Sequence, residues 1–377
     1  MRIIVMTNRF GDLGTHPQLT ELAIHLKGAG HDVRAISLGP TGSIVPMFAE
    51  AGIRTDVIDA SSKGSFVAVV ARLASLFRRR RPEAVIAFLY ESIMPARLAG
   101  RLAGVPVVIS SIRNEYFGRR YREVFIKLTQ RLSDATVVNS EIVAESLIRR
   151  RVASRKQLVV VPNAVDASRF RPAPQTRDAT RRRSSIAAED FLWLSMGRLG
   201  EQKAYPTLLR AFVQVVEAIP SSKLLVAGRG PMHDELQRLI HRFRLQDSVS
   251  LLGYRDDVPE LLSAADAFVM ASRYEGMPNA MMQAMAAGLP VVGTDVGGIP
   301  ELIRNKVNGY IVPAGDAAAL ARDMVRLSTA TADERRTMGS NGRTLIEERF
   351  STDRVMDLWL DLIDRCSNHG ATSRFVR

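Results

Sequence analysis

The sequence predicts an α/β protein made of two doubly wound domains, each a parallel sheet covered by helices on both faces. Its 377 residues suit two domains better than one. Short apolar runs rich in β-branched residues alternate with amphipathic stretches, a pattern typical of buried parallel strands joined by helices. A proline-rich stretch near the middle interrupts this alternation. We therefore expect an N-terminal domain at residues 1–170 and a C-terminal domain at 171–377.

The N-terminal half opens with an apolar run that reads as a buried strand, and a turn at residues 30–32 leads into the next strand. The same rhythm then repeats to about residue 161. We expect strands at 3–7, 33–37, 84–88, 105–110, 135–139 and 158–161, with helices near 16–27, 65–80, 92–103, 118–132 and 140–151.

Pro162, Pro172 and Pro174 mark an interdomain linker that reaches Gln175, after which the alternation restarts. We expect strands at 192–196, 223–227, 249–251, 267–270, 291–293 and 309–312, with helices between the later strands. Further helices are expected near 204–219, 232–243, 316–328, 332–349 and 352–366. The terminal helix is a candidate to pack back on the N-terminal domain. Because doubly wound sheets bind ligands at the carboxyl ends of their strands, we expect the two domains to face a ligand cleft.

Charge is unevenly divided between the two halves. The chain carries a net charge of +13, of which +11 falls within residues 1–170. Arginines cluster at 78–81, around Tyr121 and at 149–151. Such clusters favour a partner that carries phosphate, either a nucleic acid or an anionic membrane surface. Tyr116, Phe117 and Tyr121 among Arg119, Arg120 and Arg122 suggest an interfacial helix.

Cysteine content and hydropathy bound the location of the protein. Cys366 is the single cysteine, so no disulfide can form within the chain, and it is expected to be an incidental thiol in a reducing compartment. No apolar run approaches the roughly 18 residues that a membrane span needs. We expect a cytoplasmic protein that is soluble or peripheral on the inner face of the cytoplasmic membrane.

The sharpest motif runs from Glu275 to Gln283, between a predicted strand and a predicted helix. Pro278 is expected in the first helical turn, where a proline loses no hydrogen bond. Glu275 would lie in the loop, and Gln283, a little over two turns further on, would face the same ligand. Backbone N–H groups near residues 276–279 would offer an anion site at the helix N-terminus.

Two further motifs follow the first two strands of the C-terminal half. Arg198 and Lys203 lie where a strand end and its loop can bring two cations onto one phosphate group. Gly228, Arg229 and Gly230 follow the next strand and would let the backbone approach a nucleotide closely. Either motif alone is also compatible with an ordinary strand-to-helix turn.

Taken together, the order and spacing of these segments resemble the retaining glycosyltransferases of the GT-B fold that carry an E-x7-E signature, often called family 4. Such proteins contain two Rossmann-like domains. The resemblance covers nearly the whole chain and rests on the glycine loop before His16, residues 104–108, 135–140 and 161–166, and then 197–203, 253–258, 275–283 and 286–301.

The resemblance implies that Arg198 and Lys203 hold the diphosphate of a nucleotide-sugar and that Glu275 bonds hydroxyls of the donor sugar. Position 283 would bond the ribose, but it is Gln283 here, and an amide lacks the charge-assisted bonds of a carboxylate. The full donor-binding set is expected to be Gly14, Gly228, Arg229, Gly276, Met277, Pro278, Asn279 and Gln283. Arg113 and Asn114, where relatives often have a histidine, are expected on the acceptor side.

The function expected from the resemblance is transfer of a hexose, with retention, from a nucleotide-sugar that is most commonly UDP-linked. A lipid-linked or polysaccharide acceptor in cell-envelope glycan synthesis, lipopolysaccharide included, would suit the basic N-terminal half. No metal cofactor is expected, because Arg198, Lys203 and the helix N-terminus after Glu275 would stabilise the leaving diphosphate.

Other functions fit the sequence less well. A GT-B nucleotide-sugar epimerase or phosphorylase remains an alternative. A nucleic-acid-binding protein would explain the arginines but not the nucleotide-sugar motifs. An NAD-dependent oxidoreductase would need a G-x-G-x-x-G turn, which neither the loop at Gly11 and Gly14 nor the turn at 228–230 supplies.

Overall fold

The computed structural model describes all residues except 12–15, 41, 43, 59–64, 115–116 and 374–377. It divides into two compact units, the first comprising residues 1–163 and 353–377 and the second residues 164–352. Each unit contains a parallel sheet with helices on both faces, which confirms the predicted fold class. Of the described helices, none is both long enough and apolar enough to cross a bilayer.

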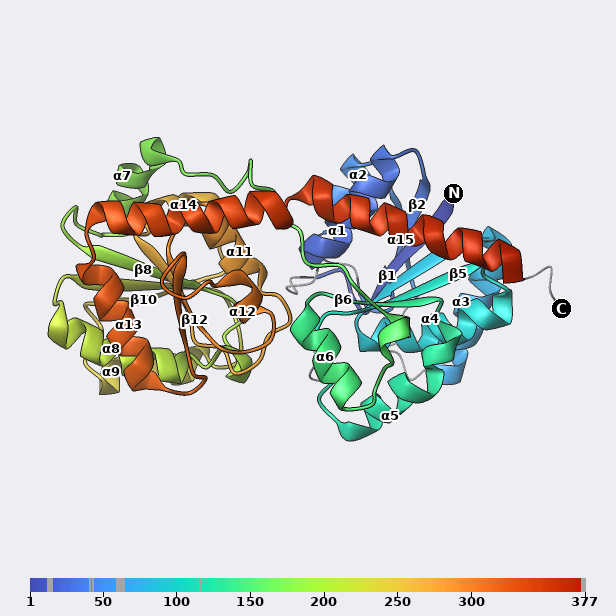
Figure 1. Cartoon of the computed structure of the whole chain (residues 1–377), viewed down its shortest axis with the longest axis horizontal. Helices are drawn as coiled ribbons and strands as arrows, with labels where there is room; N and C mark the ends of the chain where they lie inside the picture. Colours follow the sequence, from blue (N-terminus) through green and yellow to red (C-terminus); the bar gives the residue numbers. More distant parts are fainter. Residues whose placement is uncertain (12–15, 41, 43, 59–64, 115–116, 374–377) are drawn as a thin grey trace. The chain divides into compact units, whose positions relative to one another are not determined.

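The N-terminal unit is built on a seven-stranded sheet in the order β3-β2-β1-β4-β5-β6-β7. Helices α1, α2 and α15 lie on one face of this sheet and α3 to α6 on the other (Figure 1). The strands are β1 Arg2–Thr7, β2 Asp32–Ser37, β3 Arg54–Val57, β4 Ala84–Phe88, β5 Val107–Ile112, β6 Ala135–Val138 and β7 Leu158–Val160. The α-helices are α1 His16–Gly28, α2 Val45–Glu50, α3 Phe66–Arg80, α4 Tyr90–Ala103, α5 Arg120–Thr129, α6 Glu141–Arg149 and α15 Thr352–Ser373.

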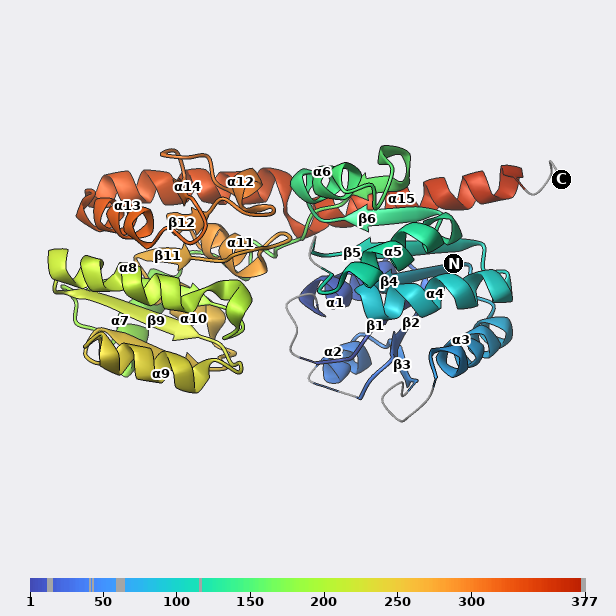
Figure 2. The ribbon, with the colours of Figure 1, turned by 90° about the horizontal axis from the view of Figure 1, so that it is seen from below.

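The C-terminal unit has a six-stranded sheet in the order β10-β9-β8-β11-β12-β13. Its strands are β8 Phe191–Met196, β9 Ser222–Ala227, β10 Val249–Gly253, β11 Ala267–Met270, β12 Val291–Thr294 and β13 Gly309–Val312. Its α-helices are α7 Pro174–Arg183, α8 Tyr205–Ala218, α9 His233–Arg242, α10 Val258–Ala264, α11 Asn279–Ala286, α12 Ile299–Leu302, α13 Ala317–Thr329 and α14 Ala332–Arg349. Figure 2 shows α8 and α9 together on one side of this sheet.

The burial of the central strands on both faces explains the two hydrophobic cores. Central strands such as β4, β5 and β8 are buried at every position, because helices cover both faces. In the N-terminal unit, Ile4 and Met6 of β1 pack with Leu73 and Phe77 of α3. These side chains form the core between the sheet and the helices α3 and α4.

Three sequence expectations differ from the structure. Strand β3 was not predicted, because Arg54–Val57 is polar and only partly buried at the sheet edge. The linker continues past Pro174 as helix α7. The division between units falls after Asn163, before the expected position of 170, because Val165 and Phe170 pack in the C-terminal core.

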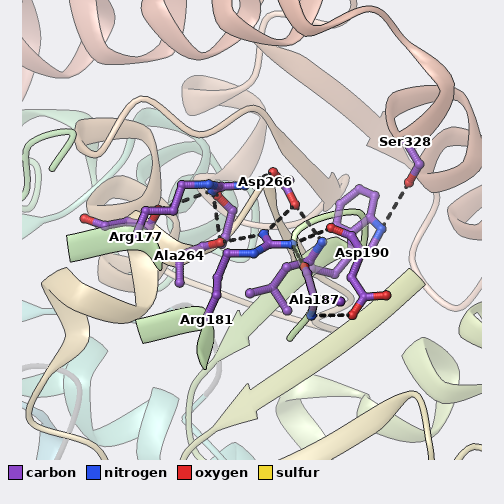
Figure 3. Close-up of polar contacts among 11 residues, drawn as sticks. Arg177, Arg181, Ala187, Asp190, Ala264, Asp266 and Ser328 are labelled. Carbon is purple, nitrogen blue, oxygen red and sulfur yellow. Dashed lines mark hydrogen bonds and ion pairs between the residues drawn. The ribbon is translucent and has the colours of Figure 1, made fainter. Parts of the chain in front are cut away.

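Helix α7 is anchored to the C-terminal unit by a carboxylate shared between two arginines (Figure 3). Arg177 donates to Asp266 Oδ1 at 2.5 Å and to the carbonyl of Ala264 at 3.0 Å at the end of α10. Arg181 donates to Asp266 Oδ2 at 3.2 Å, and its side chain is only 4% exposed. The Asp266 carboxylate also accepts the backbone N–H of Leu192 at 2.7 Å. The Asp266 carboxylate therefore joins α7 to β8, and the same two arginines also bind the end of α10.

We expect Asp266→Ala to destabilise the C-terminal unit by about 3 kcal/mol, because it leaves the buried Arg181 guanidinium without its carboxylate. Urea unfolding followed by the fluorescence of Trp193, in a Trp359→Phe background, measures this change. Asp333→Ala removes a carboxylate whose pair with Arg336 lies in solvent, so it should leave the unfolding midpoint nearly unchanged. Equal midpoints for the two variants would contradict the anchor.

Candidate functional site

The turns that follow β8 and β9 pack against each other backbone to backbone. Gly197 donates its N–H to the carbonyl of Ala227 at 3.0 Å, and Leu199 donates to that of Arg229 at 2.9 Å. A Cβ at Gly228 would lie 1.9 Å from the carbonyl oxygen of Gly197. A Cβ at Gly230 would lie 2.2 Å from that of Leu199. Only glycine allows this approach, so the two turns form one surface at the carboxyl edge of the sheet.

Lys203 is directed inward by a short 3-10 helix, Glu201–Lys203, which ends at Ala204 with φ +47°. Its Nζ lies 2.6 Å from Oε1 of Glu275 and its side chain is 15% exposed. The side chain also passes close to Gly197, where a Cβ would come within 2.8 Å of the lysine Cε. Arg198, Lys203 and Glu275 are the three residues predicted to be catalytic, and the structure brings Lys203 and Glu275 into direct contact.

The Glu275 carboxylate is buried and held by several donors. Ser272 donates its hydroxyl to Oε1 at 2.7 Å, and Gln202 donates its amide to Oε2 at 3.3 Å. Gln202 also binds the carbonyl of Tyr274 at 3.0 Å, which ties the 3-10 helix to the loop after β11. Neither Ser272 nor Gln202 was predicted from the sequence as a site residue, although each lies within three residues of one. A carboxylate fixed in this way can accept hydrogen bonds from the hydroxyl groups of a sugar.

A third strand end closes around the same loop. Gly298 donates its N–H to the carbonyl of Gly276 at 2.5 Å. Gly297 has φ +51°, and a Cβ there would lie 2.0 Å from the carbonyl oxygen of Glu275. The turn after β12 therefore supports the backbone of the residues that the sequence assigned to the donor.

The helix after Glu275 begins one residue later than expected. Pro278 is the N-cap of α11, with an extended ψ of 111°, so it precedes the helix instead of lying in its first turn. Met277 is buried, whereas Asn279 and Gln283 are half-buried. Gln283 lies on the second turn of α11, on the same helix as the predicted anion site.

The two arginines predicted to contact the donor face solvent. Arg198 and Arg229 are both exposed on the packed glycine turns. The Arg229 guanidinium lies 5.5 Å from the centre of the Tyr254 ring. These two arginines and Lys203 follow two neighbouring strands, so three positive groups share one edge of the sheet.

The predicted acceptor-side arginine is buried within the N-terminal unit. Arg113 is 5% exposed, stacks 4.7 Å from the centre of Phe88 and 5.7 Å from that of Trp359, and donates to Asn163 Oδ1 at 3.0 Å. Burial lowers the pKa of its guanidinium to about 9. Its Nε has no hydrogen-bond partner among the residues that the structure describes. Asn114 beside it is half-buried, and Gly14 lies outside the described residues.

No three His, Cys, Asp or Glu side chains among the described residues lie close enough together to hold a metal ion. Cys366 is partly buried, and burial raises the pKa of its thiol to about 11. The thiol is therefore protonated near neutral pH.

Known families and structures match both halves. The family described as "Glycosyl transferases group 1" matches residues 176–345, and "Glycosyl transferase 4-like domain" matches residues 14–164. An Escherichia coli UDP-Gal:alpha-D-GlcNAc-diphosphoundecaprenol alpha-1,3-galactosyltransferase is 27% identical over 347 residues, covering 83% of this chain and 88% of that protein. The E. coli K12 putative colanic acid biosynthesis glycosyltransferase WcaL is 29% identical over 69% of this chain and 62% of its own length.

Solved structures share the fold. Anabaena Alr3699/HepE in complex with UDP superposes with a TM-score of 0.85 and 19% identity, covering 97% of this chain and 100% of that one. WaaG, a glycosyltransferase involved in lipopolysaccharide biosynthesis, gives a TM-score of 0.76 and 15% identity over 94% of this chain and 99% of that one. The two parallel-sheet units therefore have the GT-B fold.

We expect Gly230→Ala to lower the thermal unfolding midpoint and to weaken nucleotide binding, because the added methyl group meets the Leu199 carbonyl and must separate the two turns. Gly200→Ala is the matched control, since no atom lies within 4 Å of a Cβ there. Scanning calorimetry of both variants, with and without UDP, makes the comparison. An unchanged Gly230→Ala protein would show that the packing of the turns is not required.

Proposed function

We propose, because this chain belongs to the glycosyltransferases of the GT-B fold, that it transfers a hexose from a nucleotide-sugar to a lipid-linked glycan. The observation that carries this proposal is the contact between Lys203 and Glu275 beside the packed glycine turns. The contact joins a cation suited to phosphate and a carboxylate suited to sugar hydroxyls. The relatives named in the comparisons are glycosyltransferases, so they do not favour the alternative of an epimerase or phosphorylase.

Lys203 can bind the donor without losing Glu275. Its ammonium has three protons, so one can remain on Oε1 of Glu275 while another reaches a phosphate oxygen. Arg198, exposed on the same turn, would add a planar fork of donors. The leaving diphosphate gains negative charge in the transition state, and these two cations stabilise that charge without a metal ion.

Retention of anomeric configuration is part of the proposal. Glu275 already interacts with Lys203, Ser272 and Gln202, which suits a carboxylate that orients hydroxyls better than one that attacks carbon. We propose a same-face displacement in which an oxygen of the leaving diphosphate takes the proton of the acceptor hydroxyl. The C1–O bond to phosphate breaks as the C1–O bond to the acceptor forms.

The donor is proposed to be UDP-linked. The HepE structures contain UDP and UDP-glucose, and the E. coli galactosyltransferase is named for UDP-Gal. Gln283 on α11 would offer its amide oxygen to one ribose hydroxyl. Without the charge of a glutamate, this contact is expected to hold the nucleoside more weakly.

The acceptor is proposed to carry a diphosphate and a lipid. Residues 1–170 hold +11 of the net charge of +13, and the E. coli relative is named for a diphosphoundecaprenol acceptor. A positively charged domain attracts such an anionic acceptor and the membrane that contains it.

Helix α5 presents an apolar stripe that suits a membrane surface. Tyr121, Val124, Phe125 and Leu128 are 48–71% exposed and follow the i, i+3, i+4, i+7 spacing of one helix face, whereas Ile126 is buried. The exposed residues Arg119, Arg120, Lys127 and Arg131 flank the stripe. An amphipathic helix of this kind binds in the plane of an anionic interface.

This stripe corrects the interfacial helix expected from the sequence. Phe117 is buried, and Tyr116 lies outside the described residues. Arg122 pairs with Glu91 at 2.9 Å and lies 4.8 Å from the Tyr90 ring, so it is not free for lipid. The exposed face instead begins at Tyr121 and continues to Leu128.

We expect Lys203→Ala and Arg198→Ala each to reduce kcat/KM for a UDP-hexose by at least about 100-fold, because each removes a cation from the leaving diphosphate. Transfer to a polyprenyl-diphosphate glycan acceptor measures the rate. Arg210→Ala, on helix α8 of the same unit, removes an equal charge and should keep the wild-type rate. Full activity of the first two variants would remove the phosphate-binding assignment.

We expect Phe125→Ser combined with Leu128→Ser to weaken binding to anionic vesicles by about tenfold or more, since two large apolar side chains no longer insert. Flotation with phosphatidylglycerol vesicles measures the loss. Val57→Ser combined with Val307→Ser removes exposed apolar side chains elsewhere and serves as the control. If the α5 variant floats like wild type but sediments as a smaller species, the stripe joins two copies of the chain instead.

A further inference from the structure

A second positively charged feature belongs to the N-terminal unit, whereas the candidate active site is built from residues of the C-terminal unit. A pocket of about 220 Å³ is found at the amino-terminal edge of β1, β2 and β3, beside the last turn of α3. Its polar lining consists of Arg2, Asp32, Arg34, Arg54, Arg79 and Arg80. The candidate active site is built at the carboxyl ends of strands in the C-terminal unit, whereas this pocket lies at the amino ends of strands in the N-terminal unit. The proposed function therefore leaves this pocket unexplained.

The strand register explains why arginines from three strands meet here. Arg2 pairs with Asp32, Ile4 with Arg34, and Arg34 with Arg54. Because side chains alternate along a strand, Arg2 lies on the same face as Ile4, which is buried in the core. On the face that α3 covers, the strands therefore carry apolar side chains in the core and arginines near their amino-terminal ends.

Helix α3 adds the remaining two arginines at its end. Arg81 adopts φ +49° and terminates the helix, and its carbonyl accepts a hydrogen bond from Arg2 Nε at 2.8 Å. This contact joins the end of α3 to β1, and Arg79 and Arg80 line the pocket together with the arginines of the three strands. Both are exposed, and neither forms an ion pair within the part of the chain that the structure describes.

Acidic side chains only partly balance the five guanidinium groups. Arg34, 12% exposed, pairs with Asp56 at 2.8 Å. The Arg54–Asp32 and Arg2–Glu83 pairs are 3.7 and 3.9 Å long, beyond hydrogen-bond distance. Five positive and three negative groups leave a charge of about +2, with guanidinium protons still available. Like charges held this close repel one another unless an anion joins them.

We propose that this pocket binds a phosphate or diphosphate group. Guanidinium forks match phosphate oxygens in two-point contacts, and a charge of +2 complements a phosphate dianion. The volume is smaller than the roughly 300–1,000 Å³ of pockets for drug-sized ligands, which suits a small anionic group. The group can belong to a free phosphate compound or to a lipid headgroup, and the chemistry of recognition is the same.

The test is calorimetric titration of the full chain with inorganic pyrophosphate at low salt, with and without excess UDP. We expect wild-type protein to bind pyrophosphate in the presence of UDP, because the pocket is separate from the donor site. Arg79→Gln combined with Arg80→Gln should weaken this binding at least tenfold. Arg149→Gln combined with Lys156→Gln removes the same charge from exposed sites in the same unit and should change it less than twofold.

Two results would overturn the proposal. Complete loss of pyrophosphate binding when UDP is added would place the anion in the donor site alone. Equal weakening in both double variants would show a general effect of net charge. Arg80→Lys separates geometry from charge, because it keeps the cation but loses the fork, and it should weaken binding to an intermediate degree.

A vesicle experiment distinguishes the two sources of phosphate. If the natural ligand is a lipid headgroup, Arg79→Gln with Arg80→Gln lowers flotation with phosphatidylglycerol vesicles at least tenfold while the α5 stripe is intact. If the ligand is a free compound, flotation stays at the wild-type level although pyrophosphate binding is lost. Hexose transfer, measured separately, reports on the proposed function independently of either result.

Discussion

The ion pair between Lys203 and Glu275 is the interaction on which the candidate site depends. Its partners follow β8 and β11, two strands separated by about seventy residues of chain, and their contact holds the two loops at one edge of the sheet. A carboxylate as buried as Glu275 requires a positive or donating partner, and Lys203, Ser272 and Gln202 supply three. The same pairing sets the position of the Lys203 ammonium, beside Gly197 of the packed turns.

Sequence patterns predicted most of the fold because its central strands are buried on both faces and read as continuous apolar runs. Strand β3 lacks that signal, since it lies at the sheet edge and pairs polar residues with β2. Helix α7 was missed for a related reason: its sequence is rich in arginine, and its anchor on Asp266 lies some ninety residues away. Both elements are stabilised by tertiary contacts, which the local pattern of apolar residues does not predict.

The site was predicted where its chemistry is carried by local motifs and missed where it depends on distant contacts. Lys203 and Glu275 were identified from their loops, but the supporting side chains Ser272 and Gln202 have no motif of their own. Arg113 was predicted as a site residue, but its surroundings could not be predicted from the sequence. The family resemblance placed it on the acceptor side, yet its guanidinium lies over the rings of Phe88 and Trp359, which are far apart in the sequence. Only the folded chain brings these rings together.

The return of α15 to the N-terminal unit has a consequence for how the protein is made. Trp359 stacks on Phe88 and closes over Arg113, but it is synthesised after the entire C-terminal unit. On the ribosome, the first 163 residues therefore emerge with part of their interior uncovered. The C-terminal unit, which is continuous in sequence, can finish folding earlier than the domain that precedes it. Translation order and folding order are thus expected to differ in this chain.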